Sequence, residues 1–341
     1  MAQDTPASIH PGRWWHALDD GRLQCDLCPR DCQLHEGQRG ACFVRQSIQG
    51  QMVLTTYGRS SGFCIDPIEK KPLNHFYPGT AILSFGTAGC NLACKFCQNW
   101  DISKSRDMDR LMDAASPDAI AQAARRLGAP AVAFTYNDPV IFAEYAMDTA
   151  QACREAGIRS VAVTAGYIHA APRREFFALM DAANVDLKSF SDAFYIKYCN
   201  GRLEPVKQTL KTMVELGLLV EVTTLVIPGL NDDPGELEQM ASFIAGKLGP
   251  STPWHLSRFH PAYQLTQIGS TPVETLETAC DIALSAGLVH VYTGNVPGAR
   301  ENTYCPACGR TVVKRFGYTV ENFLTQTNKC PGCAAPVFGI Y

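Results

Sequence analysis

Seven short apolar runs, most of them separated by segments with helical character, dominate the chain from residue 82 to residue 293. Short apolar runs of this kind are typical of buried strands, and their alternation with helices favours parallel strands joined by right-handed crossovers. The count falls short of the eight repeats of a closed barrel, so the pattern predicts an α/β fold with a partial (β/α)6 barrel. The predicted strands cover residues 82–85, 131–135, 160–164, 185–188, 220–227, 254–259 and 289–293.

Capping signals mark several predicted helices between these runs. Ser116 precedes Pro117, the order of an N-cap followed by a first-turn proline. Asp233 and Pro234 repeat that order, and Glu236 completes a predicted capping box. Each of three further predicted helices is followed by a glycine that can end it; they cover residues 140–156, 206–216 and 273–286.

Three cysteines directly after the first predicted strand form the candidate catalytic loop. Cys90, Cys94 and Cys97 have the spacing C-x3-C-x2-C, and no fourth cysteine lies in the same loop. Three thiolates can hold a [4Fe–4S] cluster by three of its irons and leave the fourth iron open for chemistry. Sites in such barrels collect at the carboxyl ends of the strands, where this loop is expected. The motif resembles the signature of the radical S-adenosylmethionine (SAM) enzymes.

Polar residues follow other predicted strands at the same edge. Tyr136, Asn137 and Asp138 come after the second strand, and Asp138 before Pro139 also has the order of a helix N-cap. Both interpretations stay open, because a capping carboxylate can also face the amino group of SAM.

Three more candidates come from later strands. Asp186 and Lys188 are two residues apart in a predicted strand, so they share a face, either as a structural ion pair or as part of a polar site. His260 follows Arg258 at the end of the sixth strand and is either a functional group or a bystander.

Two further cysteine groups flank the predicted barrel. Residues 1–79 contain Cys25, Cys28, Cys32 and Cys42, four thiols that could bind zinc or an auxiliary iron–sulfur cluster. Residues 299–341 contain a zinc-ribbon pattern of two C-P-x-C knuckles, with an iron site of the rubredoxin kind as its rival; its cysteines are Cys305, Cys308, Cys330 and Cys333. Gly317 between the knuckles is expected in a hairpin turn, and Cys64 is expected to be an isolated core thiol.

Composition and charge narrow the location and partners. The chain has 341 residues, 15 cysteines and a formal net charge of −3. Cysteines in metal-type clusters without an apolar leader segment favour a reducing, cytoplasmic location, and no apolar run is long enough to cross a membrane. The charge gives no electrostatic reason to expect nucleic acid or a membrane surface as a partner, although a zinc-ribbon binding module is a further alternative.

Within the predicted barrel domain, residues 80–298, about residues 80 to 295 resemble the activating enzymes of glycyl-radical enzymes such as pyruvate formate-lyase. The similarity rests on 90–99, on the D-L-K sequence 186–188, on the P-G-x-x-D turn 228–232 and on His260 at the end of the sixth strand. A closer resemblance, to the radical SAM member of the AmmeMemoRadiSam family, rests in addition on 27–32, 134–139, 258–261 and 292–298.

The resemblance implies a [4Fe–4S] cluster, SAM, and reduced flavodoxin or ferredoxin as electron donor. It implies reductive cleavage of SAM to a 5′-deoxyadenosyl radical that abstracts hydrogen from a substrate, either a partner protein that gains a glycyl radical or a small molecule. Two departures bear on SAM binding. The acidic residue of the second strand end is Asp138 where the family usually has glutamate, and Thr223 stands where the activating enzymes have arginine. A non-catalytic iron–sulfur and zinc protein is the remaining alternative.

Overall fold

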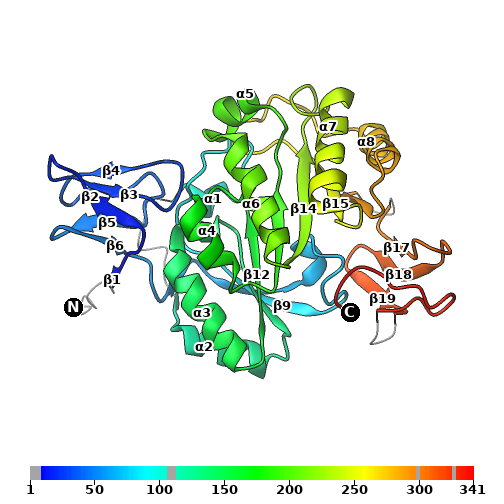
Figure 1. Cartoon of the computed structure of the whole chain (residues 1–341), viewed down its shortest axis with the longest axis horizontal. Coiled ribbons are helices and arrows are strands. Elements are labelled where there is room, and N and C mark those ends of the chain that lie inside the picture. The colour runs from blue at the N-terminus through cyan, green and yellow to red at the C-terminus, as the bar shows by residue number, and fades with distance from the viewer. Residues whose placement is uncertain (1–8, 106–112, 297–299, 325–327) are drawn as a thin grey trace.

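The computed structural model describes residues 9–105, 113–296, 300–324 and 328–341. Its centre is an eight-stranded sheet with the order β16-β15-β14-β13-β12-β11-β9-β8, so the sheet is open, with β16 and β8 at its edges (Figure 1). Strand β8 (Phe63–Pro67) is antiparallel to its neighbour, and the other seven strands are parallel. The parallel strands are β9 (Ala81–Phe85), β11 (Ala131–Phe134), β12 (Arg159–Thr164), β13 (Ala182–Asp186), β14 (Leu219–Val226), β15 (Trp254–Arg258) and β16 (Val291–Gly294). The α/β class and the parallel strands predicted from the sequence are confirmed.

Each of the first six parallel strands leads into a helix. The main helices are α2 (Pro117–Arg126), α3 (Ala143–Glu155), α4 (Ala170–Phe177), α6 (Leu203–Glu215), α7 (Pro234–Phe243) and α8 (Val273–Ser285). Shorter helical turns are η1 (Ile68–Lys70), α1 (Trp100–Ser103), η3 (Pro139–Phe142), α5 (Asp192–Phe194), η4 (Tyr195–Cys199) and η5 (Ile244–Leu248).

The predicted caps are confirmed, with one correction. The Ser116 hydroxyl accepts from the Ala119 amide, and Asp233 accepts from the Glu236 amide. The Glu236 carboxylate, however, accepts from the Ser189 hydroxyl and the Phe190 amide instead of returning to its own cap. The capping-box role was therefore wrong: this carboxylate joins the loop after β13 to α7.

The amino-terminal end of the inner sheet face is closed by the chain just before β9. Ile68, Leu73 and Phe76 pack against apolar residues of β9, β11, β12, β13 and β14. The buried Glu221 carboxylate accepts the backbone amides of Asn74 and His75, which satisfies two donors inside the fold. The sheet domain thus begins before residue 80, because β8 and this segment both belong to it.

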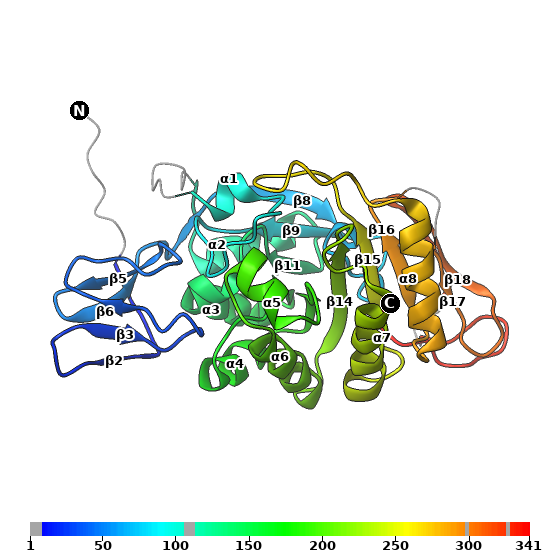
Figure 2. The ribbon, with the colours of Figure 1, turned by 90° about the horizontal axis from the view of Figure 1, so that it is seen from above.

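Two small β units lie at opposite ends of the sheet domain (Figures 1 and 2). The amino-terminal unit has two three-stranded sheets: β1 (His10–Pro11), β6 (Gln51–Leu54) and β5 (Arg45–Ile48) in one, and β2 (Trp15–Ala17), β3 (Leu23–Cys25) and β4 (Gln33–Leu34) in the other. A buried ion pair between Arg45 and Glu144 of α3 fastens this unit to the domain. A further two-stranded sheet pairs β7 (Arg59–Ser60) with β10 (Asp113–Ala114).

The carboxyl-terminal unit is a three-stranded sheet of β17 (Thr303–Tyr304), β18 (Thr311–Phe316) and β19 (Thr319–Asn322). The buried Arg315 guanidinium donates to the carbonyl of Asn74 and the hydroxyl of Thr303, which docks the unit on the sheet domain. Gly317 has φ +59° in the turn between β18 and β19, so its predicted role as a hairpin glycine is confirmed.

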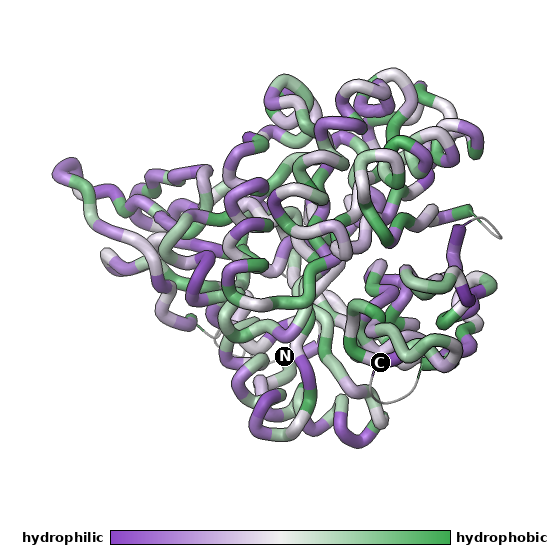
Figure 3. The backbone as a smooth tube through the Cα atoms, turned by 45° about the vertical axis from the view of Figure 1, so that its right-hand side comes forward, coloured by the Kyte–Doolittle hydropathy of each residue, from purple (hydrophilic) through white to green (hydrophobic). Residues whose placement is uncertain are grey.

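Hydrophobic segments run through the interior of the sheet domain, whereas many of its outer turns are hydrophilic (Figure 3). Among the described residues, no helix is both long enough and apolar enough to span a membrane.

Acidification is expected to weaken the junction between the sheet domain and the carboxyl-terminal unit. His75 and His290 pack there with ring centroids 4.3 Å apart and the rings tilted by 52°, and burial lowers the pKa of both, to about 4 for His290. In the unfolded chain these histidines bind protons near pH 6.5, but in the folded protein they do so only at lower pH. The contribution of the neutral histidines to the free energy of unfolding is therefore present above pH 6.5 and is lost as the pH falls towards 4. We expect His290 alone to cost about 2 kcal/mol at pH 5 relative to pH 7. The check is thermal unfolding at both pH values for the wild type, His290→Gln and the exposed control His35→Gln. An equal acid shift in all three proteins would contradict the prediction.

Candidate functional site

The three-cysteine loop follows β9 and lies against the chain near η4. The Ala93 amide donates to the Cys199 carbonyl at 2.8 Å, and the Lys95 amide donates to the Tyr198 carbonyl at 2.9 Å. Cys94 is buried, whereas Cys90 and Cys97 are partly exposed. The loop therefore presents three thiols from a backbone that is held by a neighbouring segment.

Asn137 fixes the start of this loop. Its amide group donates to the Gly89 carbonyl and the Thr87 hydroxyl, and its side-chain oxygen accepts the Thr87 amide. These contacts occupy the buried side chain, so the structure places Asn137 as a support of the cysteine loop. Gly86 lets the chain after β9 lie close to the chain after β11, because a Cβ at Gly86 would overlap the carbonyl oxygen of Thr135.

Asp138 sits beside the loop with all its contacts inside the fold. One carboxylate oxygen accepts from the Val140 amide and the Thr164 hydroxyl, and the other accepts from the Ala165 amide at 3.0 Å. Burial raises the pKa of this carboxyl, although the three hydrogen bonds oppose the shift. The predicted cap of the following helical turn is present, and the same side chain joins the ends of β11 and β12.

Tyr136 has a left-handed backbone conformation, and its side chain contacts β8 rather than the cysteine loop. Its φ of +69° is unusual for a residue with a side chain, and such conformations are held by surrounding contacts. Its hydroxyl donates to Asp66 at 2.6 Å, and that carboxylate also pairs with Lys70 and Lys71. Tyr136 therefore belongs to a polar cluster that reaches back to β8.

Lys188 and Cys199 lie close to Cys94. The Lys188 ammonium pairs with Asp186 at 2.8 Å and lies 5.8 Å from the centre of the Phe96 ring. A hydrogen bond with Cys199 and the nearby charge of Lys188 lower the pKa of Cys94, whereas burial raises the pKa of Cys90 to about 12. Cys199 was missed in the sequence, because it is 105 residues from Cys94 and carries no motif.

Thr223, His260 and Arg258 lie at the ends of later strands and have different contacts. Thr223 is paired with Asp186 in the sheet, and its buried hydroxyl has no hydrogen-bond partner in the described part of the chain. His260 is exposed and contacts the Ser270 hydroxyl at 3.1 Å, and Arg258 donates to the Thr271 carbonyl. None of the hydrogen bonds of His260 and Arg258 within the described part of the chain reaches the cysteine loop.

A pocket of about 560 Å3 opens beside the cysteine loop. Its walls carry three lysines and mixed side chains from the loop, from η4 and from the chain after β15: Ala93, Lys95, Lys104, Ile196, Lys197, Asn200, Tyr263 and Gln264. Trp100 stacks on Tyr263 with ring centroids 5.8 Å apart. Sequence reasoning missed this pocket, because its residues come from three separate parts of the chain.

The carboxyl-terminal cysteines form a compact set. The ligand atoms of Cys305, Cys308, Cys330 and Cys333 all lie within 4.8 Å of one another. Two sulfur–sulfur distances are 3.6 and 3.7 Å. Four thiolates at about 2.3 Å around a tetrahedral ion would have sulfur atoms about 3.8 Å apart, so this group is suited to one metal ion.

The amino-terminal cysteines are arranged differently. Cys25, Cys28, Cys32 and Cys42 line one hollow, but in the described part of the chain only the carboxyl-terminal group was found as a compact set of metal ligands. Cys64, which was expected in the core, is instead exposed on β8, because that strand lies at the edge of the sheet.

The geometry is that of an α/β domain with a three-thiol loop at the carboxyl ends of parallel strands, and comparison with known proteins gives it a class. Residues 85–244 match the model of the Radical SAM superfamily. The chain is also 41% identical over 327 residues to an uncharacterized protein of Methanocaldococcus jannaschii, covering 95% of this chain and 97% of that protein. The chain therefore belongs to the family of that archaeal protein, and its residues 85–244 match the radical SAM superfamily.

Solved structures share the fold. A radical SAM methyltransferase from Sphaerobacter thermophilus superposes with a TM-score of 0.51 and 17% identity, covering 88% of this chain and 80% of that one. SuiB from Streptococcus suis, solved bound to S-adenosylmethionine, has a TM-score of 0.50 and 14% identity, with 64% of this chain and 52% of SuiB covered. At these identities the likeness shows a common architecture.

Proposed function

We propose that this protein is a radical SAM enzyme in which Cys90, Cys94 and Cys97 hold a [4Fe–4S] cluster by three irons. The observation that carries the proposal is the three-thiol loop at the carboxyl end of β9, within the segment that matches the superfamily. When bound, the cluster and SAM supply a 5′-deoxyadenosyl radical that abstracts hydrogen from the substrate. Reduced flavodoxin or ferredoxin is the proposed electron donor.

The residues around the loop fit an iron–sulfur cluster. At Cys90 burial favours the neutral thiol unless a metal compensates the thiolate, whereas at Cys94 the hydrogen bond with Cys199 and the charge of Lys188 favour the thiolate. Three separate irons also need three separate thiolates, and these cysteines were not found as a compact single-ion set among the described residues.

We propose different tasks for the predicted SAM contacts. Lys188 supplies the cation for the SAM carboxylate, because Thr223 offers only a hydroxyl, and Asp186 orients that lysine. Tyr136 remains a candidate contact at the end of β11. Asn137 and Asp138 act by holding the loop and strand ends, and His260 stays the weakest of the six candidates.

The pocket beside the loop bears on the substrate. Its three lysines favour an anionic group, and its surroundings expose apolar side chains, with Trp100 49% and Ile196 48% exposed. An apolar rim favours a macromolecular partner. The second candidate function is therefore modification of a partner protein, including generation of a glycyl radical, with a small anionic molecule as the alternative.

For the carboxyl-terminal unit we propose zinc bound by Cys305, Cys308, Cys330 and Cys333 in a structural role. The sulfur spacing supports a tetrahedral ion, and zinc is the common occupant of such four-thiolate sites.

The function is tested by anaerobic reconstitution with iron and sulfide, followed by reduction and EPR with and without SAM. We expect a reduced-cluster signal that shifts when SAM is added, together with release of 5′-deoxyadenosine. A reconstituted cluster that neither responds to SAM nor releases 5′-deoxyadenosine would identify a non-catalytic iron–sulfur and zinc protein instead.

A further inference from the structure

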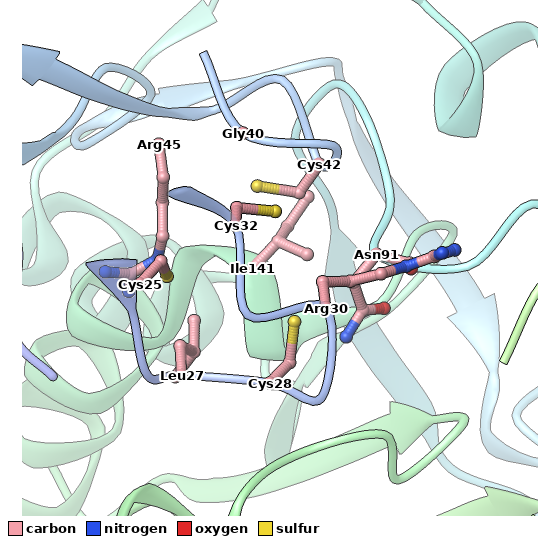
Figure 4. A pocket seen from close by; sticks show the side chains of 10 residues that line it. All are labelled: Cys25, Leu27, Cys28, Arg30, Cys32, Gly40, Cys42, Arg45, Asn91 and Ile141. Atoms are coloured by element: carbon pink, nitrogen blue, oxygen red, sulfur yellow. The ribbon is translucent and has the colours of Figure 1, made fainter. Parts of the chain in front are cut away.

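Four cysteines of the amino-terminal unit surround a hollow that the proposed function does not use. Cys25 ends β3, Cys28 and Cys32 lie on the following turn, and Cys42 comes from the loop before β5. Figure 4 shows the four side chains around this hollow, with Arg45 beside Cys25. Three of the four are buried and Cys32 is partly exposed.

The spacing of these thiols differs from that of the carboxyl-terminal unit. A single zinc ion holds four sulfur atoms around a common centre, and the compact group at Cys305 has the spacing that such an ion needs. In a [4Fe–4S] cluster each thiolate binds its own iron, so the sulfur atoms stay farther apart around a larger core. Among the described residues, neither Cys25, Cys28, Cys32 and Cys42 nor the cysteines of the Cys90 loop form such a compact set, which fits the second pattern.

The lining offers hydrogen-bond donors to sulfur. The Arg45 side chain is 1% exposed, and its Nε has no hydrogen-bond partner among the described residues. Its two terminal nitrogens each donate one hydrogen bond, one to Glu144 and one to the Arg13 carbonyl, so Nε is the Arg45 nitrogen still available beside the hollow. The Ala41 amide donates to the Cys32 sulfur at 3.4 Å. Hydrogen bonds to sulfur are a recognised means of tuning an iron–sulfur cluster.

The hollow directly adjoins the loop of the radical SAM site. Gly89, the residue before Cys90, packs so closely on the Cys42 carbonyl that a Cβ would overlap it. On the other side of Cys90, the Asn91 carbonyl accepts from Arg30 at 2.6 Å, and both of these residues line the hollow. The contact between Cys42 and Gly89 and the hydrogen bond between Arg30 and Asn91 thus join the two cysteine groups.

We propose that Cys25, Cys28, Cys32 and Cys42 bind a second [4Fe–4S] cluster, fully ligated by protein, which exchanges single electrons with the cluster at Cys90, Cys94 and Cys97. An external one-electron reductant, such as dithionite or a reduced flavodoxin, converts the second cluster from its 2+ to its 1+ state. That electron then passes to the other cluster, and no covalent bond forms or breaks. The site assignment stands on the amino-terminal residues alone, whereas the electron exchange rests on the proposed function.

The test removes one site while leaving the other intact. A variant combining Cys90→Ser, Cys94→Ser and Cys97→Ser is reconstituted anaerobically with iron(II), sulfide and zinc(II), and its metals are counted. We expect about four irons and four sulfides per chain, an EPR signal after dithionite reduction and one zinc, against about eight irons in the wild type. Adding Cys28→Ser and Cys32→Ser should remove the remaining iron but keep the zinc.

The triple variant is informative when its melting curve matches that of the wild type. In that case, zinc in place of iron at the amino-terminal site, or no metal there, would overturn the assignment. This result does not depend on SAM cleavage, so it is separate from failure of the proposed function. In reduced wild-type protein we expect an EPR spectrum broadened by coupling of two clusters. A spectrum equal to the sum of the two isolated signals would overturn the electron exchange.

Discussion

A Cys94→Ser protein is expected to release less than about 1% of the wild-type 5′-deoxyadenosine under reducing conditions. Loss of an outer contact of a metal site typically costs 10–100-fold, so loss of a ligand is expected to cost more than about 100-fold. Serine places a hard oxygen where the cluster requires a soft thiolate. Cys94 is the most buried of the three thiols, so water cannot easily replace it.

The measurement combines iron content, EPR with SAM, and chromatography of 5′-deoxyadenosine. Cys280→Ser, which changes a buried thiol on α8 outside the loop, serves as the matched control and is expected to keep activity. Cleavage at the wild-type rate by a folded Cys94→Ser protein would refute the assignment of the cluster to this loop.

The second large effect is expected from Gly89→Ala. Gly89 has φ +84°, where alanine is strained, and the added methyl group would overlap the Cys42 carbonyl oxygen. Backbone oxygen cannot swing away like the end of a flexible side chain, so the loop or the amino-terminal unit has to shift. We expect a loss of unfolding free energy above about 3 kcal/mol, beyond the 1–3 kcal/mol of backbone strain alone, and loss of most iron from the Cys90 loop.

The control variant Gly21→Ala separates the cost of backbone strain from the cost of atomic overlap. Gly21 has nearly the same φ, +83°, but nothing lies within 4 Å of its missing Cβ. Chemical denaturation and iron analysis of both variants therefore measure strain with and without overlap. If Gly89→Ala were no more destabilising than Gly21→Ala, the close contact between Cys42 and Gly89 would be refuted.

Features that depend on neighbouring residues could be predicted from the sequence. The seven parallel strands follow from apolar runs, the starts of α2 and α7 follow from Ser116 and Asp233, and the cysteine groups follow from spacing. The β13 run was placed about three residues late, at 185 rather than Ala182, because alanines and an asparagine at its start carry little strand signal.

Features that depend on distant residues could not be predicted in the same way. Glu236 looks like a capping-box residue locally, yet it binds Ser189 and Phe190 about 46 residues away. Arg45 and Glu144 are 99 residues apart, and nothing in either local sequence indicates their buried pair. The motif 292–298 ends at Pro297 and Gly298, which lie outside the described residues.

The contact between His75 and the end of the chain sets an order of events during synthesis. The His75 ring bonds the Phe338 carbonyl and the Tyr341 hydroxyl, and Phe338 is 263 residues further along. At a translation rate of 5–20 residues per second, the ribosome needs roughly 10 to 50 s to supply that partner. Until then His75 and the neighbouring Tyr292 lack part of their native surroundings. The nascent sheet domain is therefore expected to stay vulnerable to proteases and to need chaperone protection until Phe338 and Tyr341 have been synthesised and can contact His75.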